Sequence, residues 1–149
     1  MSNALPYWLM AILFSAWVSV AQADSDTWRT ADASLYHALG EKPGIAAIVT
    51  DMLINIANDE RIVEHFADTD IDRLQRLLNE QFCVLSGGPC RYTGGSMREA
   101  HHGKNIGEAE FNALVENLID AMESNGVPLA AQNRLLGVLA PLHGDVIGR

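Results

Sequence analysis

The stretch Gly87–Gly107, GGPCRYTGGSMREAHHGKNIG, decides how the rest of this chain is interpreted. Its glycines and proline flank one short run, Ser96–His102, that is compatible with a helix. Successive helical residues point about 100° apart, so the two adjacent histidines face different ways. His101 shares a face with Met97, four residues earlier, whereas His102 points away from that face. We therefore expect His101 to be the ligand if a metal or cofactor binds here, and the alternative is a packed, structural histidine.

Apolar residues at a spacing of three to four predict that the remaining segments are also helical. Asp70 is suited to cap one of these helices, and Pro141 is expected to kink or end the last one. Ser34 is suited to cap a short first helix that ends at Gly40. The predicted helices span residues 34–40, 43–56, 71–85, 111–122 and 128–146. The sequence therefore predicts an all-α domain.

The amino-terminal residues 1–23 differ from the rest because they contain no charged side chain. The apolar run Tyr7–Val20 precedes Ala21-Gln22-Ala23, which has the small-x-small form of a signal-peptidase site. We expect a signal peptide over residues 1–23, a tail over residues 24–33, and a domain over residues 34–149. The alternative is an uncleaved anchor, but about 14 apolar residues are few for a bilayer. We therefore expect the mature protein to be exported to a periplasm and to have no stable membrane span after cleavage.

The net charge of the 149-residue chain is −9. An acidic surface repels the phosphates of nucleic acids and anionic lipids, so no nucleic-acid partner is expected. Hydrophobic residues make up 48 % of the chain, which is enough to form one buried core.

The run Gly87–His101, with its pattern GGPxxYTGxSMREAH, resembles the segment before the heme-ligating histidine of group 1 truncated hemoglobins. Further matching pieces are LYHALG (35–40), HFAD (65–68), GVPLAAQNRLL (126–136) and APLHGDV (140–146). The resemblance covers roughly Leu35–Gly148. It implies a two-over-two helical sandwich around heme b, with His101 as the proximal iron ligand.

The resemblance also identifies residues expected to contact the heme. Phe66 matches the phenylalanine that stacks on the heme, while Tyr92 and Arg98 match positions near the heme edge. At that position Arg98 could pair with a propionate, and the alternative is an ordinary surface arginine. His143 lies near a position where some members bond covalently to a heme vinyl, and the alternative is a histidine favoured by a helix carboxyl terminus. The predicted cofactor-binding residues are Phe66, Leu53, Leu74, Leu77, Leu78, Phe82, Tyr92, Met97, Arg98, Ile106 and Phe111.

On the gas-binding side the chain departs from the family pattern. Positions where many members place a tyrosine, glutamine, lysine or histidine are occupied here by Leu53, Leu77 and Leu78. Leucine donates no hydrogen bond, so weak and rapidly reversible oxygen binding is expected. Gln81 is the nearest polar alternative, and His37 and His65 are outside candidates for a second axial ligand.

Cys83 and Cys90 are the only cysteines of the chain. In an exported protein an even number of cysteines favours a disulfide, which would tie the end of the third predicted helix to the loop before His101. The alternative is a pair of free, buried thiols.

These observations favour a heme protein that binds oxygen, carbon monoxide or nitric oxide for gas binding, transport or sensing. The alternative is a nitric oxide dioxygenase or weak peroxidase that uses the same heme with a possible reductase as partner. A third hypothesis is a helical module without heme.

Overall fold

The computed structural model describes residues 27–148, so the predicted signal peptide lies outside the described residues. Within residues 27–148 the chain is helical and contains no strand, which confirms the all-α prediction. The α-helices are α1 (Thr27–Ala38), α2 (Glu41–Ala57), α3 (Ile71–Leu85), α4 (Met97–His101), α5 (Glu108–Ser124), α6 (Leu129–Leu139) and α7 (His143–Val146). Two 3-10 helices, η1 (Val63–Phe66) and η2 (Ala140–Leu142), lie between them.

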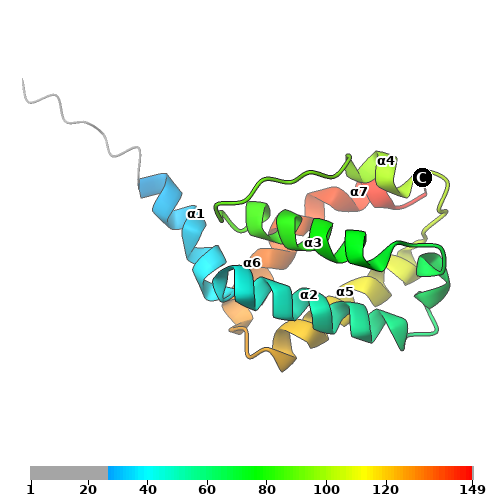
Figure 1. Ribbon diagram of the computed structural model, residues 1–149, viewed down its shortest axis with the longest axis horizontal. Coiled ribbons are helices and arrows are strands. Elements are labelled where there is room, and N and C mark those ends of the chain that lie inside the picture. The colour runs from blue at the N-terminus through cyan, green and yellow to red at the C-terminus, as the bar shows by residue number, and fades with distance from the viewer. Residues whose placement is uncertain (1–26, 149) are drawn as a thin grey trace, which may run out of the picture.

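Helices α2, α3, α5 and α6 form the body of the molecule (Figure 1). Helix α2 makes its most extensive contacts with α5 and α3, while α4 packs against α7 at one edge. The core lies between these helices and includes side chains that are almost completely buried, such as Val49, Ala121 and Leu135. The apolar stripes of the sequence therefore meet in one shared core.

Local capping explains several helix boundaries. Asp70 caps α3 as predicted, because its carboxylate accepts a hydrogen bond from the backbone N–H of Arg73 at 3.0 Å. Beyond the end of α3, Gly87 adopts a positive φ of 84°, which glycine tolerates without a steric penalty. Pro141 interrupts the last helix as predicted, since α6 ends at Leu139 and the chain continues as η2 and α7.

One predicted boundary is wrong. Ser34 does not cap the first helix, because α1 begins at Thr27 and continues through Ser34 to Ala38. Serine is tolerated inside a helix, so its capping preference does not by itself place a boundary.

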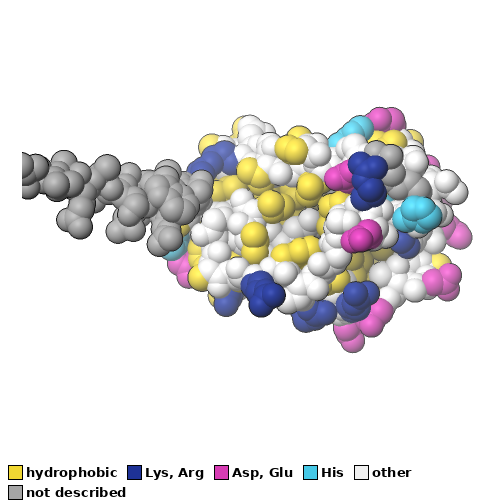
Figure 2. All heavy atoms as spheres, turned by 90° about the horizontal axis from the view of Figure 1, so that it is seen from above, with side chains coloured by type: hydrophobic (Ala, Val, Ile, Leu, Met, Phe, Trp, Pro, Cys, Tyr) yellow, Lys and Arg dark blue, Asp and Glu magenta, His cyan; other side chains and the backbone are white. Residues whose placement is uncertain are grey.

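Seen from above, hydrophobic side chains gather over the middle of the described surface (Figure 2). Most of the acidic side chains in this view lie toward the end away from the grey residues, whereas Lys and Arg side chains occur at both ends and along the lower edge. Among residues 27–148, no helix is both long and apolar enough to cross a membrane.

Candidate heme-binding cavity

A cavity of about 640 Å³ lies between two walls of the molecule. The first wall comes from α2, η1 and α3, and the second comes from α4, the segments that flank it, α5 and α7. Most of the lining is apolar, and it contains two histidines, one from each wall. The cavity therefore has the size and composition of a site for a mostly apolar cofactor.

His101 projects into this cavity from the second wall. Its Nδ1 lies 2.7 Å from the backbone carbonyl oxygen of Met97, one turn earlier in α4. A carbonyl only accepts hydrogen bonds, so the proton is assigned to Nδ1 and the lone pair to Nε2. An imidazole oriented in this way is suited to bind a metal through Nε2. His102 is exposed and does not line the cavity, as the helical phase predicts.

Helix α4 is short but has a well-defined beginning. The Ser96 hydroxyl accepts from the backbone N–H of Glu99 at 3.2 Å, and the Glu99 carboxylate accepts from the backbone N–H of Ser96 at 3.0 Å. The Ser96 hydroxyl also donates to Glu99 at 2.8 Å, and this bond lowers the pKa of the Glu99 carboxyl. This reciprocal capping fixes the turn that carries Met97 and His101.

Eight of the predicted cofactor-binding residues line the cavity, together with the predicted ligand His101. They are Phe66, Leu74, Leu77, Leu78, Tyr92, Met97, Ile106 and Phe111.

Three predicted residues lie outside the lining. On α2, Leu53 packs against the core, and its neighbour Met52 lines the cavity instead. On α3, Phe82 is buried in the core, and its neighbour Gln81 lines the cavity instead. Arg98 is exposed and pairs with Asp145 of α7. In each helix the adjacent residue has the phase that faces the cavity.

The structure adds lining residues that the sequence analysis did not assign to the cofactor. The apolar ones are Met52, Ile56, Ile62, Ala100, Leu114 and Val146, and the cationic ones are Arg73 and Lys104. A recognisable signal for Arg73 is the spacing of four that it shares with Leu77 and Gln81 along α3. Gln81 donates to the sulfur of Met97 at 3.4 Å, which joins α3 to α4.

The loop between α3 and α4 is attached to α3 on both sides of Tyr92. Cys83 and Cys90 form a disulfide with an S–S distance of 2.00 Å. The Glu80 carboxylate accepts from the Thr93 backbone N–H at 2.8 Å and from its hydroxyl at 2.7 Å, and these bonds lower the pKa of Glu80. Burial raises the pKa of the Tyr92 phenol, and the negative charge of Glu80 adds to this effect. Tyr92 is therefore held as a neutral phenol in the cavity wall.

Two other histidines considered in the sequence analysis are engaged elsewhere. His143 lies outside the lining, where its Nε2 is 3.1 Å from a carboxylate oxygen of Glu108. Its ring also stands edge-on to Phe111, at a centroid distance of 4.7 Å. His37 is exposed, with its Nδ1 2.9 Å from Glu41. His65, in contrast, lines the cavity.

Comparison with known proteins places this geometry in a family. Residues 34–147 match the family of bacterial-like globins. A group 1 truncated hemoglobin of Mycolicibacterium paratuberculosis is 31 % identical over 114 residues, which cover 76 % of this chain and 84 % of the relative. One from Tetrahymena pyriformis is also 31 % identical, over 78 % of this chain and 96 % of its own length.

Solved structures show the same similarity in three dimensions. The truncated hemoglobin of Tetrahymena pyriformis in its Fe(III) form superposes with a TM-score of 0.75, covering 77 % of this chain and 98 % of that one, at 31 % identity. The 2/2 hemoglobin of a Synechococcus species, in its cyanomet state with covalently attached heme, superposes with a TM-score of 0.70 over the same shares. Its identity is 24 %, so that comparison shows the fold alone.

Proposed function

Because the chain belongs to the bacterial-like globins and, within them, to the group 1 truncated hemoglobins, we propose that it binds heme b in this cavity and takes up a diatomic gas at the iron. The observation that carries the proposal is the position of His101. Its Nδ1 faces the Met97 carbonyl oxygen at 2.7 Å, so Nε2 is the nitrogen left to bind iron from the second wall.

The other lining residues fit the remaining parts of the same cofactor. The cavity volume of about 640 Å³ lies within the range of about 300–1,000 Å³ that is usual for ligand pockets. Phe66 and the α3 leucines offer apolar contact to a porphyrin ring. Arg73 and Lys104 are the cationic side chains of the lining, and they are suited to pair with the two propionates.

The first wall favours gas binding over oxidative catalysis. Ferrous heme iron binds oxygen, carbon monoxide and nitric oxide. Leu74, Leu77 and Leu78 line the wall opposite α4, and none of them donates a hydrogen bond to a ligand that gains negative charge. Stabilising such charge usually requires polar groups aimed at it. Reversible binding for transport or sensing therefore suits the cavity better than turnover of nitric oxide or peroxide.

We also propose that the protein works outside the cytoplasm, in a periplasm. The support is the apolar segment before Ala23 together with the disulfide between Cys83 and Cys90, a bond that persists in oxidising compartments.

Replacing each of the two adjacent histidines tests the proposal. His101→Ala should weaken heme binding by at least about tenfold, because removing even an outer partner of a metal ligand costs about ten- to a hundredfold. His102→Ala is the matched control and should retain heme, because His102 is exposed and lies outside the cavity. The measurement is a heme titration followed by absorption, and added imidazole should restore the spectrum of His101→Ala. Equal affinity in both variants would rule out His101 as the ligand.

A further inference from the structure

The cavity is lined by two histidines that come from opposite walls. His101 comes from α4, whereas His65 comes from η1, in the connection between α2 and α3. His65 is half-buried, and its side chain forms no hydrogen bond or ion pair within residues 27–148. A partly buried imidazole normally finds a polar partner, so this ring is available to a ligand that enters the cavity.

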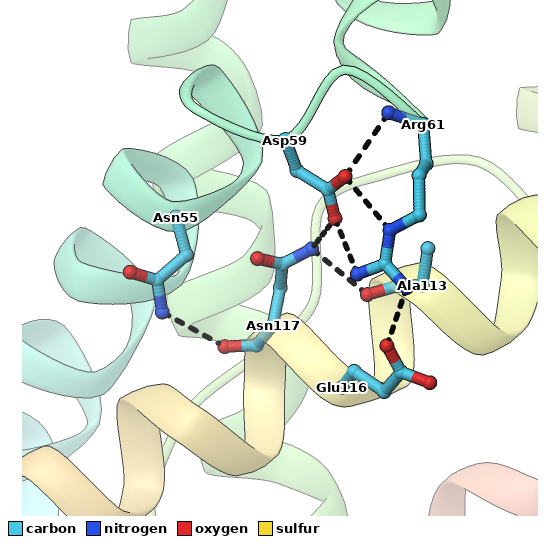
Figure 3. A network of polar contacts seen from close by, with 6 residues as sticks. All are labelled: Asn55, Asp59, Arg61, Ala113, Glu116 and Asn117. Atoms are coloured by element: carbon cyan, nitrogen blue, oxygen red, sulfur yellow. Dashed lines mark hydrogen bonds and ion pairs between the residues drawn. The ribbon is translucent and has the colours of Figure 1, made fainter.

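The backbone that carries His65 is anchored to α5 by a polar network (Figure 3). The Asp59 carboxylate accepts from the backbone and side chain of Arg61, and from the buried Asn117 amide at 2.7 Å. Arg61 also donates to Glu116 of α5 at 2.6 Å. Hydrogen bonding to Arg61, and then to Asn117, holds the pKa of Asp59 well below its ordinary range.

This network positions the segment that follows it. The backbone N–H of Ile62 donates to the Asp59 carbonyl at 3.1 Å, and that of His65 donates to the Ile62 carbonyl at 3.1 Å. Ile62 is buried, and both Ile62 and Phe66 line the cavity beside His65. The turn from Asp59 to Phe66 is therefore a fixed part of the first wall.

The rest of the first wall offers few competing iron ligands. The α3 leucines have no donor atom, and Gln81 is engaged with Met97. Asp68, Thr69 and Asp70 also line this wall, but they offer oxygen atoms, which suit magnesium, calcium and manganese, whereas imidazole suits iron. Arg73 is a cation and does not bind iron. A neutral imidazole is a good iron ligand, and His65 presents the one imidazole of this wall among the described residues.

We infer that His65, on the wall that faces His101, would be a second ligand of the heme iron when no gas is present. This inference rests on the proposed heme binding and adds a way in which the protein regulates its affinity for gas. An incoming gas would have to displace the imidazole of His65. The apparent affinity for the gas is then the intrinsic affinity multiplied by the fraction of molecules in which His65 is not bound to the iron. His65 then acts as a residue that sets the concentration at which gas binds.

The test compares the heme-loaded wild-type protein with two variants. His65→Phe keeps an aromatic ring but removes the nitrogen, and His37→Phe makes the same change at an exposed histidine outside the cavity. Wild type and His37→Phe should give low-spin, six-coordinate absorption and electron paramagnetic resonance spectra typical of two imidazoles. His65→Phe should be high-spin, and should bind carbon monoxide about tenfold faster or more, because the iron is no longer occupied.

The possible outcomes separate the two proposals. A wild-type protein that binds heme but is high-spin, or a low-spin spectrum that persists in His65→Phe, would overturn the role of His65 and leave heme binding intact. Failure of the wild-type protein to bind heme would overturn both. The wild-type electron paramagnetic resonance spectrum keeps the proposal open to refutation even if His65→Phe does not fold, because a high-spin, heme-loaded wild-type protein excludes a second imidazole ligand.

Discussion

The guanidinium of Arg98 donates to the carboxylate of Asp145 at 2.7 Å, and this ion pair joins α4 to α7. Because both side chains are partly exposed, the pair contributes little to stability by its charge alone. Its main consequence is geometric, since Arg98 is directed along the outside of α4 and is not available to a propionate. Arg73 and Lys104 line the cavity in its place.

The first prediction follows from this assignment of the cations. Arg73→Gln and Lys104→Gln should each speed heme loss by about two- to fivefold, as expected for a partly exposed ion pair worth about 0.4–1 kcal/mol. The measurement is the rate of heme transfer to an excess of an apo-globin acceptor at low and high salt. Screening should reduce the effect at high salt.

Arg98→Gln is the control for these two variants. This variant also removes one positive charge, but Arg98 does not line the cavity. As a control, Arg98→Gln should lose heme at about the wild-type rate. Faster heme loss from Arg98→Gln than from Arg73→Gln would show that Arg98 is the propionate partner.

A second prediction concerns hydrogen bonding to bound oxygen. In the His65→Phe background, where no imidazole competes for the iron, oxygen should dissociate rapidly because α3 supplies leucines. Adding Leu78→Gln introduces a donor on the lining and should slow oxygen release by about tenfold or more, since a hydrogen bond to a charged acceptor contributes about 1.5–3 kcal/mol. Stopped-flow spectroscopy measures the rate.

Leu85→Gln makes the same change on the same helix, but Leu85 does not line the cavity. Its oxygen release should match that of the His65→Phe parent. Carbon monoxide gains less charge on binding, so its release should change less than that of oxygen in Leu78→Gln. Slow oxygen release from the parent itself would mean that another donor, such as Gln81, reaches the ligand.

The third prediction concerns Asp59 and the pH dependence of stability. Its carboxyl pKa is lowered in the folded protein, first by Arg61 and then by Asn117, so the unfolded chain binds the proton more tightly. The stabilisation by Asp59 is therefore complete above the unfolded pKa of about 3.9, and it is lost as the pH falls toward the folded pKa. Asp59→Asn should destabilise the protein at neutral pH, and its difference from wild type should shrink below about pH 4.

Urea unfolding between pH 3 and pH 7 measures this difference. Asp51→Asn is the matched control, because Asp51 accepts a hydrogen bond from Asn125 at 2.7 Å and pairs with no arginine among the side chains that the structure describes. A constant difference between Asp59→Asn and wild type across this pH range would show that the carboxylate charge is not the source of the stabilisation.

The fourth prediction concerns the disulfide, which closes a loop between residues seven apart in sequence. A cross-link over so short a loop stabilises the folded state by about 2–2.5 kcal/mol in the chain-entropy model. Cys83→Ala with Cys90→Ala should lower the free energy of unfolding by about that amount while leaving heme bound. Protein from an oxidising compartment should react with a thiol reagent under denaturing conditions only after reduction, and two reactive thiols beforehand would contradict this prediction.

The sequence predicts helices well where local chemistry sets their ends. Asp70 caps α3 and Pro141 interrupts the last helix because both effects depend on neighbouring backbone atoms. Ser34 fails as a predicted cap because its preference is weak and α1 extends past it. Local rules therefore account for most of the fold but not for every boundary.

The cavity lining depends more strongly on tertiary packing. Met52 and Leu53 are both apolar neighbours on α2, and periodicity alone does not decide which of them faces the cavity. The direction of Arg98 is set by Asp145, which is 47 residues away in sequence. Such long-range contacts leave no signal in local spacing.

The second wall of the cavity is completed by the last residues of the described chain. Val146 lines the cavity, Asp145 holds Arg98, and the backbone N–H of Gly148 donates to the Ile106 carbonyl at 3.0 Å. These residues leave the ribosome after every other part of the wall. During synthesis the site thus remains open until residues 145–148 emerge, and a product that stops before Asp145 would lose a wall contact while keeping the α2–α5 core.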